Sequence, residues 1–265
     1  ALSATGRRVI EWTRSHGDVA DASAFSNFGD VDFVFHLAAR TFVPESWKVP
    51  AEFQRTNVLG TVNALEFCRA RGLRMTNMSA YLYGAPATLP VGESSARVPN
   101  NPYALSKFLA EQMCEFYAAY YGVGVATLRP FNVYGPGQKP NFLVPSILGQ
   151  IRRGGMIRVK DLAPKRDYVF IDDVVSALVA TMDRPNGYFA VNIGSGKSLS
   201  VGEVISIAQA VAGTNLPVQE EGEVRAQEIP DVYADISRAW ETLRWKPQTD
   251  FTRGIEYILQ QEQRS

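Results

Sequence analysis

Strand-like runs alternate with helical patterns over the first 196 residues, and this alternation constrains the fold more than any other feature of the chain. The strand-like runs cover residues 31–38, 73–79, 123–130 and 188–193, and the helical patterns cover about 51–71, 102–121 and 171–183. A strand, a helix and a second parallel strand form a right-handed crossover, and repeated crossovers place helices on both faces of one sheet. The sequence therefore predicts an α/β protein with a doubly wound parallel sheet.

Two further stretches, about 138–165 and 197–265, carry more Gly and Pro and have less regular spacing. Helix-like pieces occur in them at about 142–153, 200–212, 236–243 and 251–262. Open parallel sheets bind ligands beyond the carboxyl ends of their strands. We therefore expect a ligand crevice between the sheet and the structure formed by these two stretches.

Tyr103 and Lys107 form a Tyr-x-x-x-Lys motif that predicts an acid–base catalyst. Asn101 can cap a helix and Pro102 suits its first turn, so the two side chains lie at i and i+4 on one helical face. A free tyrosine titrates near pH ~10, and an adjacent ammonium favours the phenolate, which makes it a better general base. Ser79, upstream of the motif, can supply a hydrogen bond to the reacting group. By itself the motif is common, and without other matching segments an exposed helical pair would be the favoured interpretation.

Other segments occur in a fixed order around these residues. They are Val31-Asp32-Phe33-Val34-Phe35-His36-Leu37-Ala38-Ala39, Thr56-Asn57-Val58-Leu59-Gly60-Thr61, Leu128-Arg129-Pro130-Phe131-Asn132-Val133-Tyr134-Gly135-Pro136-Gly137, Arg166-Asp167-Tyr168-Val169-Phe170-Ile171-Asp172-Asp173-Val174 and Val191-Asn192-Ile193-Gly194-Ser195-Gly196. With the Ser, Tyr and Lys residues, they resemble the nucleotide-sugar epimerase and dehydratase branch of the extended short-chain dehydrogenase/reductase family. The resemblance runs from about Gly17 to the C-terminus.

The resemblance implies a Rossmann-type cofactor-binding domain formed by residues 1–137 and 166–196, and a smaller, mixed α/β substrate-binding lobe formed by 138–165 and 197–265. It also implies an N-terminal strand, a Gly-x-x-Gly-x-x-Gly turn and a helix that receive the dinucleotide pyrophosphate. This sequence starts at Ala1 and has no such turn. Because a sheet without its central strand would expose its core, we expect the first β-α-β unit to be missing from the sequence rather than from the intact protein. A truncated relative that binds cofactor poorly is the alternative.

The resemblance implies NAD as cofactor, and NADP stays open because the second strand of the fold, where the two are distinguished, is not in the sequence. The implied cofactor-binding residues are Asp18, Val19, Leu37, Ala38, Ala39, Thr56, Asn57 and Phe131. Asp18 would accept a hydrogen bond from the adenine amino group, and Phe131 would pack near the nicotinamide. Thr56 would lie near the cofactor, and Asn57 would support the site. The alternatives are a turn aspartate at Asp18 and ordinary strand packing at Leu37, Ala38 and Ala39.

The resemblance implies a nucleoside-diphosphate sugar as substrate, contacted by Thr41, Asn132, Arg166, Asn192 and Arg225. Two guanidinium groups suit a diphosphate, which makes Arg166 and Arg225 the candidate clamp, although either could be a solvated surface arginine. An asparagine buried after a strand must find a partner, so Asn132 is well placed to bind a ligand. The chain departs from its relatives at two places, Arg225-Ala226-Gln227-Glu228 in place of Arg-x-Gly-Asp and Val159–Lys165 in place of a Gly-Asp-Gly loop. The nucleotide base therefore stays open.

The composition is that of an ordinary globular protein. Lys and Arg together number 27, Asp and Glu also number 27, and 46% of the residues are hydrophobic. This balance argues against a general nucleic-acid or membrane-surface partner. Cys68 and Cys114 fall in helical patterns and are expected to be reduced core residues, and two histidines make a zinc site improbable. A cytoplasmic location is the default expectation.

The resemblance also implies a homodimer paired through the 51–71 and 102–121 helices. Apolar residues of these helices, among them Phe53, Phe116, Tyr117 and Tyr120, are expected to be exposed and to meet across a two-fold axis as a four-helix interface. The alternative is that these side chains face the sheet of their own chain.

The function that these observations favour is an NAD-dependent 4-epimerase of nucleotide sugars. Related 4,6-dehydratases carry Asp-Glu after the catalytic hydroxyl residue, whereas this chain has Ala80 and Tyr81 after Ser79. Ala80 cannot titrate, and a tyrosine with a pKa near ~10 is a poor base at neutral pH. A nucleotide-sugar reductase, a 2-epimerase or a dehydratase of the same family remains an alternative. So does a noncatalytic nucleotide-sugar or redox-sensing binding protein, although such a protein has no need of a tuned phenol.

Overall fold

A computed structural model describes residues 2–3, 6–184, 186–222 and 229–262. Its centre is a sheet of four parallel strands in the order β1-β2-β3-β8. These strands are β1 (Phe33–His36), β2 (Arg74–Met78), β3 (Val125–Pro130) and β8 (Tyr188–Ile193). Each lies within the run that the sequence predicts, so the α/β class and the parallel sheet are confirmed.

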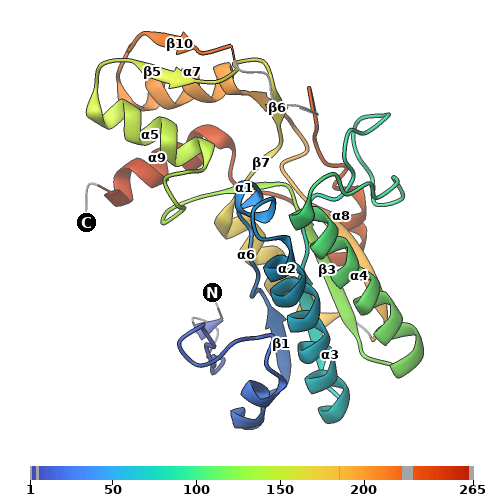
Figure 1. Ribbon diagram of the computed structural model, residues 1–265. Helices are drawn as coiled ribbons and strands as arrows, with labels where there is room; N and C mark the ends of the chain where they lie inside the picture. Colours follow the sequence, from blue (N-terminus) through green and yellow to red (C-terminus); the bar gives the residue numbers. More distant parts are fainter. Residues whose placement is uncertain (1, 4–5, 185, 223–228, 263–265) are drawn as a thin grey trace.

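Helices cover both faces of this sheet (Figure 1). One face carries α2 (Pro50–Gln54), a π-helical segment (Arg55–Leu59), α3 (Gly60–Arg71) and α4 (Pro102–Tyr121). The other carries α6 (Ile171–Ala180), which continues as a 3-10 turn (Thr181–Asp183), and α8 (Ser237–Leu243). Leu65, Cys68, Met75, Cys114 and Val125 form the core of the first face, so both cysteines are buried, reduced core residues as predicted.

The second face shows one difference from the division that the sequence implies. Ala239 and Leu243 of α8, together with Trp245, pack against Val191 and Ile193 of β8. The Trp245 indole also donates a hydrogen bond to the backbone oxygen of Asp173 at 2.9 Å. Residues 237–245 therefore belong structurally to the sheet domain and not to the smaller lobe, because their apolar side chains complete the core of the sheet.

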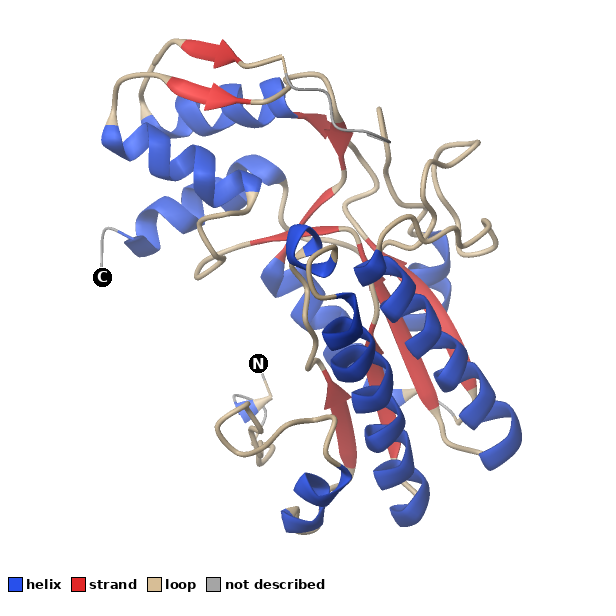
Figure 2. Ribbon diagram, in the orientation of Figure 1, coloured by secondary structure: helices blue, strands red, loops and turns tan. Residues whose placement is uncertain are grey.

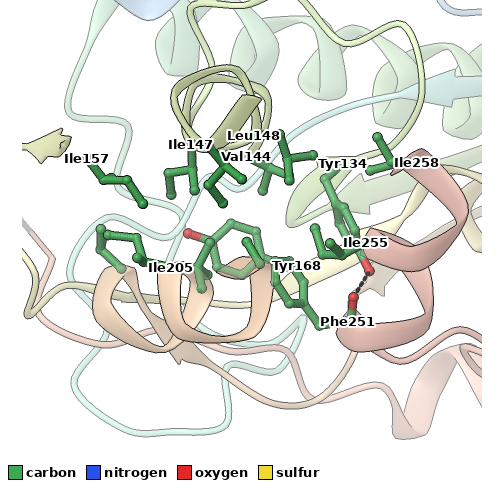
Figure 3. Packing of buried hydrophobic residues seen from close by; sticks show 14 of the residues in the cluster. Tyr134, Val144, Ile147, Leu148, Ile157, Tyr168, Ile205, Phe251, Ile255 and Ile258 are labelled. Atoms are coloured by element: carbon green, nitrogen blue, oxygen red, sulfur yellow. Dashed lines mark hydrogen bonds between the residues drawn. The ribbon is translucent and has the colours of Figure 1, made fainter. Parts of the chain in front are cut away.

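The smaller lobe is built from α5 (Leu143–Arg153), α7 (Val201–Ala212) and α9 (Phe251–Glu262), with the parallel pair β5 (Ile157–Val159) and β10 (Val218–Glu220). These helices enclose a core of their own, shown in Figure 3. Tyr134 and Phe251 meet in it with ring centroids 4.8 Å apart. Apolar faces on three helices thus bury one another, which makes this lobe a second packing unit.

Short strands connect the two parts. β4 (Asn132–Tyr134) pairs in parallel with β7 (Tyr168–Phe170), and β6 (Lys165–Arg166) pairs antiparallel with β9 (Leu199–Ser200). The central strands point toward these connections and the lobe (Figure 2). The carboxyl edge of the sheet therefore faces the region between sheet and lobe. A further short helix, α1 (Val43–Ser46), follows β1 at this edge.

β1 forms one edge of the sheet, and no described residue pairs with its outer side. The first β-α-β unit that the resemblance implies therefore stays a prediction. Within the described part of the chain, no helix has the length and apolar character needed to cross a membrane.

Candidate active site

The Ser, Tyr and Lys of the predicted trio lie where β2 ends and α4 begins. Ser79 directly follows β2, and its backbone N–H donates to the Leu128 oxygen at 2.8 Å, which extends the sheet by one bond. The side chain of Asn101 caps α4 by accepting from the Ala104 N–H at 2.8 Å, and Pro102 occupies its first turn. The local sequence therefore begins the helix at the place that aligns Tyr103 and Lys107 on one face.

The side chains of Ser79 and Lys107 are withdrawn from water, and that of Tyr103 is half-buried. Ser79 is 2% exposed and Lys107 is 4% exposed. The Tyr103 ring packs edge-on against Phe53, with centroids 6.4 Å apart. The Ser79 hydroxyl has no hydrogen-bond partner in the described structure. A buried hydroxyl without a partner at a ligand-facing edge is suited to receive a polar atom of a ligand.

Burial changes the protonation chemistry of this pair in a way that the sequence does not predict. It raises the pKa of Tyr103 to about 12 and lowers the pKa of Lys107 to about 8. Burial of Tyr103 therefore opposes the phenolate that the sequence predicts beside Lys107, and the lowering of the phenol pKa by Lys107 stays a prediction. Tyr103 needs additional positive charge to act as a base, and oxidised nicotinamide carries such a charge.

The end of β1 provides a surface that fits a planar cofactor. Leu37 is 51% exposed, and Ala38 beside it is exposed as well. Exposed apolar and small residues at the carboxyl end of a parallel strand are suited to a ring that lies against the backbone. Phe131, at the end of β3, is buried and packs edge-on against Tyr81 with centroids 5.2 Å apart.

The side-chain amide of Asn57 fixes the conformation of the segment that follows β1. Its Oδ1 accepts from the Arg40 N–H at 2.8 Å, and its Nδ2 donates to the Arg40 oxygen at 3.0 Å and to the Ser106 hydroxyl at 2.8 Å. Asn57 therefore ties the segment after β1 to α4. It lies with Thr56, which is half-buried, in the π-helical segment, an irregularity common at functional sites.

The adenine-side candidates lie before β1. The Asp18 carboxylate accepts from the Ala20 N–H at 2.9 Å and pairs with Arg55 at 2.5 Å, and these two bonds hold the pKa of Asp18 below its usual value. The backbone oxygen of Val19 accepts from Asn63 at 3.0 Å. Asp18 thus has structural partners, and its contact with adenine stays a prediction.

Two substrate-side candidates, Thr41 and Asn132, are exposed at the carboxyl edge of the sheet. The expectation that Asn132 is buried is wrong. Only its backbone is engaged, since the N–H donates to the Asp167 oxygen at 2.9 Å, and the side chain points away from the core. An exposed amide at this edge is still available to a ligand.

Asn192 was predicted to contact the substrate, and the structure places it in the interior instead. It is fully buried, its Oδ1 accepts from the Tyr83 hydroxyl at 2.6 Å and its Nδ2 donates to the Val91 oxygen at 2.9 Å. The amide therefore holds the 81–93 segment against β8 and presents no surface to a substrate. Arg166 is half-buried on β6, and its Nη1 donates to the Lys165 and Ile229 oxygens at 2.7 and 2.6 Å. Arg225 lies outside the described residues.

Sequence reasoning missed Asp167, which organises the edge near β8. This buried carboxylate accepts from the N–H groups of Ser195, Gly196 and Ala234 at 2.6, 3.1 and 3.0 Å. Burial raises its pKa, and the hydrogen bonds oppose that rise. A Cβ at Gly194 would lie 2.5 Å from Asp167 Oδ2, so only glycine fits there. The available signal in the sequence was the position of Asp167 directly after Arg166, between two predicted strand segments.

A buried ion pair was missed as well. Arg129 of β3 binds Glu111 of α4 through two contacts, Nε to Oε1 at 2.9 Å and Nη2 to Oε2 at 2.8 Å. Arg129 also donates to the Tyr83 hydroxyl at 2.8 Å. Glu111 lies one helical turn beyond Lys107, so this pair fixes α4 against the sheet next to the candidate trio of Ser79, Tyr103 and Lys107.

Taken together, the doubly wound sheet, the Ser-Tyr-Lys trio at its carboxyl edge and the separate lobe define the class of NAD(P)-dependent enzymes that act on sugar nucleotides. The profile of the NAD dependent epimerase/dehydratase family matches residues 1–194. The chain is also 34% identical over 240 residues to the GDP-6-deoxy-D-mannose reductase of Pseudomonas aeruginosa, with 86% of this chain and 79% of the reductase covered. The chain belongs to the NAD dependent epimerase/dehydratase family.

Solved structures agree with this assignment. The structure of RMD from Pseudomonas aeruginosa complexed with NADPH superimposes with a TM-score of 0.87 at 31% identity, covering 94% of this chain and 88% of that one. The UDP-glucose 4-epimerase of Thermotoga maritima with UDP-glucose superimposes with a TM-score of 0.86 at 26% identity, covering 93% and 83%. The cofactor of the protein described here is therefore NAD or NADP.

Proposed function

We propose that the protein is a 4-epimerase of a nucleoside-diphosphate sugar. In this proposal Tyr103 takes the proton of the sugar 4-hydroxyl, Ser79 donates a hydrogen bond to the same oxygen and Lys107 supplies positive charge beside the phenol. When bound, NAD would supply reversible hydride acceptance at C4, and epimerisation requires that the hydride return to the opposite face of the 4-keto sugar. Tyr103 then returns its proton to the oxygen at C4. Leu37, Ala38 and Phe131 would hold the nicotinamide end of the cofactor, and Asp18 with Val19 the adenine end.

The observation that favours a 4-epimerase over a dehydratase is the environment of Tyr81. Its phenol donates a hydrogen bond to the Gly84 oxygen, and burial raises its pKa further above the usual value. Tyr81 therefore stays protonated at neutral pH and cannot act as a base. Since Ala80 carries no titratable group, the two positions after Ser79 give no acid or base for elimination of water.

Incubation with NAD and UDP-glucose, GDP-mannose or dTDP-glucose is therefore expected to yield no 4-keto-6-deoxy product. Elimination across C5 and C6 needs its own acid and base, which the Ala80-Tyr81 pair does not supply. Mass spectrometry of the nucleotide sugars detects such a product as the loss of one water. Appearance of that mass would replace the epimerase proposal with a dehydratase.

The proposal itself is tested by product analysis. Purified protein is incubated with NAD and UDP-glucose, and UDP-galactose is measured by chromatography or by the proton spectrum of the sugar H4. The reverse reaction from UDP-galactose serves as the second measurement, since an epimerase must reach the same equilibrium from both sides. If neither direction proceeds with UDP or GDP sugars, the 4-epimerase assignment is wrong.

A nucleotide-sugar reductase is the second candidate, because the relative that is 34% identical carries that name. A reductase uses the same trio in the opposite proton direction, with Tyr103 donating a proton to the oxygen of a keto sugar. Oxidation of NADPH with a GDP-4-keto-6-deoxy sugar, followed at 340 nm, distinguishes the two activities. Rapid NADPH oxidation without epimerisation of UDP-glucose would favour the reductase.

We also propose that two copies pair through the outer surface of α3 and α4. Phe116 and Tyr120 of α4 are 46% and 74% exposed, and their tilted rings contact each other with centroids 4.7 Å apart, so α4 presents an aromatic pair on its outer surface. Phe53 does not belong to this surface: it is fully buried against Tyr103, so its expected exposure is wrong.

Light scattering at micromolar concentration is expected to give twice the mass of one chain. Phe116→Glu with Tyr120→Glu should shift that mass toward the monomer, because each carboxylate would be desolvated at the interface. Trp240→Glu on α8 is the control, since that side chain is also exposed but lies on the other face of the sheet. A monomeric mass for the unaltered protein would exclude this interface.

A further inference from the structure

Arg40 follows residues 37–39 at the end of β1, and its guanidinium makes three contacts with the next two helices. Its Nη1 donates to Glu45 Oε1 at 3.1 Å, and its Nη2 lies 3.7 Å from Glu52 Oε2. Its Cζ lies over the Phe53 ring, 5.9 Å from the ring centroid. One side chain therefore joins the end of β1 to α1, which carries Glu45, and to α2, which carries Glu52 and Phe53.

Phe53 extends this chain of contacts to the candidate catalytic tyrosine. It is fully buried on α2, and its ring meets the Tyr103 ring edge-on, with centroids 6.4 Å apart and planes at 81°. The helices α1, α2 and α4 lie against one another at this edge of the sheet (Figure 1). The Arg40 guanidinium, the Phe53 ring and the Tyr103 phenol therefore follow one another from the segment after β1 to α4.

A second route joins Arg40 to Tyr103 through its backbone. The Asn57 amide bonds both the N–H and the oxygen of Arg40, at 2.8 and 3.0 Å. Asn57 Nδ2 also donates to the Ser106 hydroxyl at 2.8 Å, and that hydroxyl donates to the Tyr103 backbone oxygen at 2.7 Å. The backbone route fixes the first turn of α4 relative to β1. The side-chain route is the one that reaches the phenol ring itself.

The phenol ring needs a restraint of its own, because a helix fixes the Cα of Tyr103 but leaves the side-chain torsions to its surroundings. A misplacement of about 1 Å at a reacting group can cost about 10²-fold in rate. The helix that carries Phe53 has only five residues, so tertiary contacts must hold it in place. The contacts of Arg40 with Glu52 and Phe53 are contacts of this kind.

The two ion pairs of Arg40 are weak sources of stability. The Glu45 and Glu52 side chains are 46% and 48% exposed, and that of Arg40 is 24% exposed. Ion pairs with half-exposed carboxylates contribute little to folding, because water and salt screen them. The contact of Arg40 with the buried Phe53 ring is therefore expected to act mainly on the orientation of its neighbours.

We propose that Arg40 is a positioning residue for Tyr103, because its guanidinium holds the Phe53 ring against the phenol ring. This inference rests on the proposed catalytic role of Tyr103. Arg40 acts on the proton transfer through Phe53, so its loss should change how well the phenol is aligned with the substrate oxygen. Binding of the sugar nucleotide should change much less, and the effect should therefore fall on kcat rather than on KM.

Substitutions at Arg40 and Phe53 test the proposal with the substrate found in the product analysis. Arg40→Met keeps an unbranched side chain without its charge, and it should lower kcat by about tenfold while KM changes by less than about twofold. Arg40→Lys keeps a cation for the ring and should recover most of the lost kcat. Phe53→Leu should lower kcat at least as much as Arg40→Met. Adding Arg40→Met to Phe53→Leu should cause little further loss, because the arginine acts through Phe53.

A measurement without substrate separates this inference from the proposed function. The ring resonances of Tyr103 in 13C-tyrosine-labelled protein are assigned with Tyr103→Phe. Arg40→Met should shift or broaden them, because the neighbouring Phe53 ring is no longer held. Arg244→Met is the matched control and should leave them unchanged. The Cζ of Arg244 also lies over a ring, 5.8 Å from the Trp240 centroid, but at the end of α8 on the other face of the sheet.

Unchanged Tyr103 resonances in Arg40→Met, or a kcat equal to that of the unaltered protein, would overturn the proposal. Additive losses in the double variant would overturn it as well, since they would show that Arg40 does not act through Phe53. If Phe53→Leu does not fold, the loss in Arg40→Met and its recovery in Arg40→Lys decide. Movement of the resonances in a protein that turns over no UDP or GDP sugar would uphold the contact and reject the 4-epimerase assignment.

Discussion

Tyr103→Phe is expected to lower kcat by about 100-fold or more while the protein stays folded and binds cofactor. Loss of a general acid–base group has effects of about 10²- to 10⁴-fold. The phenylalanine ring can keep the edge-on contact with Phe53, so only the titrating hydroxyl disappears. Turnover is measured with the substrate found in the product analysis, and cofactor affinity by calorimetric titration.

Tyr81→Phe provides the matched control for this experiment. Tyr81 is a second partly buried tyrosine near the end of β2, and its hydroxyl is used in a hydrogen bond to the Gly84 oxygen. Its removal should cost much less activity than the loss of the Tyr103 hydroxyl, because Tyr81 is assigned no proton transfer. Near-normal turnover by Tyr103→Phe, or equal losses in the two variants, would remove Tyr103 from the catalytic role.

The raised pKa of Tyr103 also shows how the site depends on its ligand. In the protein alone, burial favours the neutral phenol. A site of this kind gains base strength only when a positive ring is placed beside the phenol. In the proposed mechanism, the positive charge of oxidised NAD, when bound, would favour the phenolate of Tyr103.

The parts of the fold that local signals specify were predictable from the sequence. The cap at Asn101, the proline at Pro102 and a left-handed Gly122 at the end fix α4 to the predicted 102–121. Mostly apolar runs predicted β1, β3 and β8 for a similar reason, since strands covered on both faces are rich in apolar residues, whereas β2 (Arg74–Met78) carries three polar residues. These signals need no knowledge of distant contacts.

What the sequence could not give was the partner of each buried polar group. Asn192 follows the family pattern of a substrate contact, yet Tyr83 and Val91, about a hundred residues away, take up its amide. The assignment of residues 237–245 to the lobe fails for the same reason, because Trp245 meets Asp173 only in the folded chain. Tertiary contacts decide such cases, and spacing along the chain carries no information about them.

The Arg129–Glu111 pair is another tertiary contact that local sequence signals do not reveal. Neither residue is exceptional in the sequence, yet together they join β3 to α4. Arg129 is 3% exposed and Glu111 is wholly buried, and each guanidinium contact has hydrogen-bonding geometry. Burial of one charge without the other is costly, since the remaining ion loses both water and its partner. The pair is therefore expected to matter more for stability than any exposed ion pair of the chain.

Glu111→Gln is expected to reduce the free energy of unfolding by about 3–5 kcal/mol, because it leaves the buried charge of Arg129 uncompensated. Arg129→Met should reduce it by less, because Arg97 still pairs with the Glu111 carboxylate at 3.0 Å. Both should lower the urea midpoint measured by circular dichroism. The double variant Glu111→Leu with Arg129→Met should have a much smaller decrease in the free energy of unfolding than the sum of the decreases in the two single variants. The reason is that the interior then holds neither of the two charges. Glu66→Gln is the control: Glu66 pairs with Arg69 at 2.7 Å, but both side chains are more than 40% exposed, so a loss of about 1 kcal/mol or less is expected. Additive losses in the double variant, or a Glu66→Gln effect as large as that of Glu111→Gln, would show that charge burial does not set the stability of this helix–sheet contact.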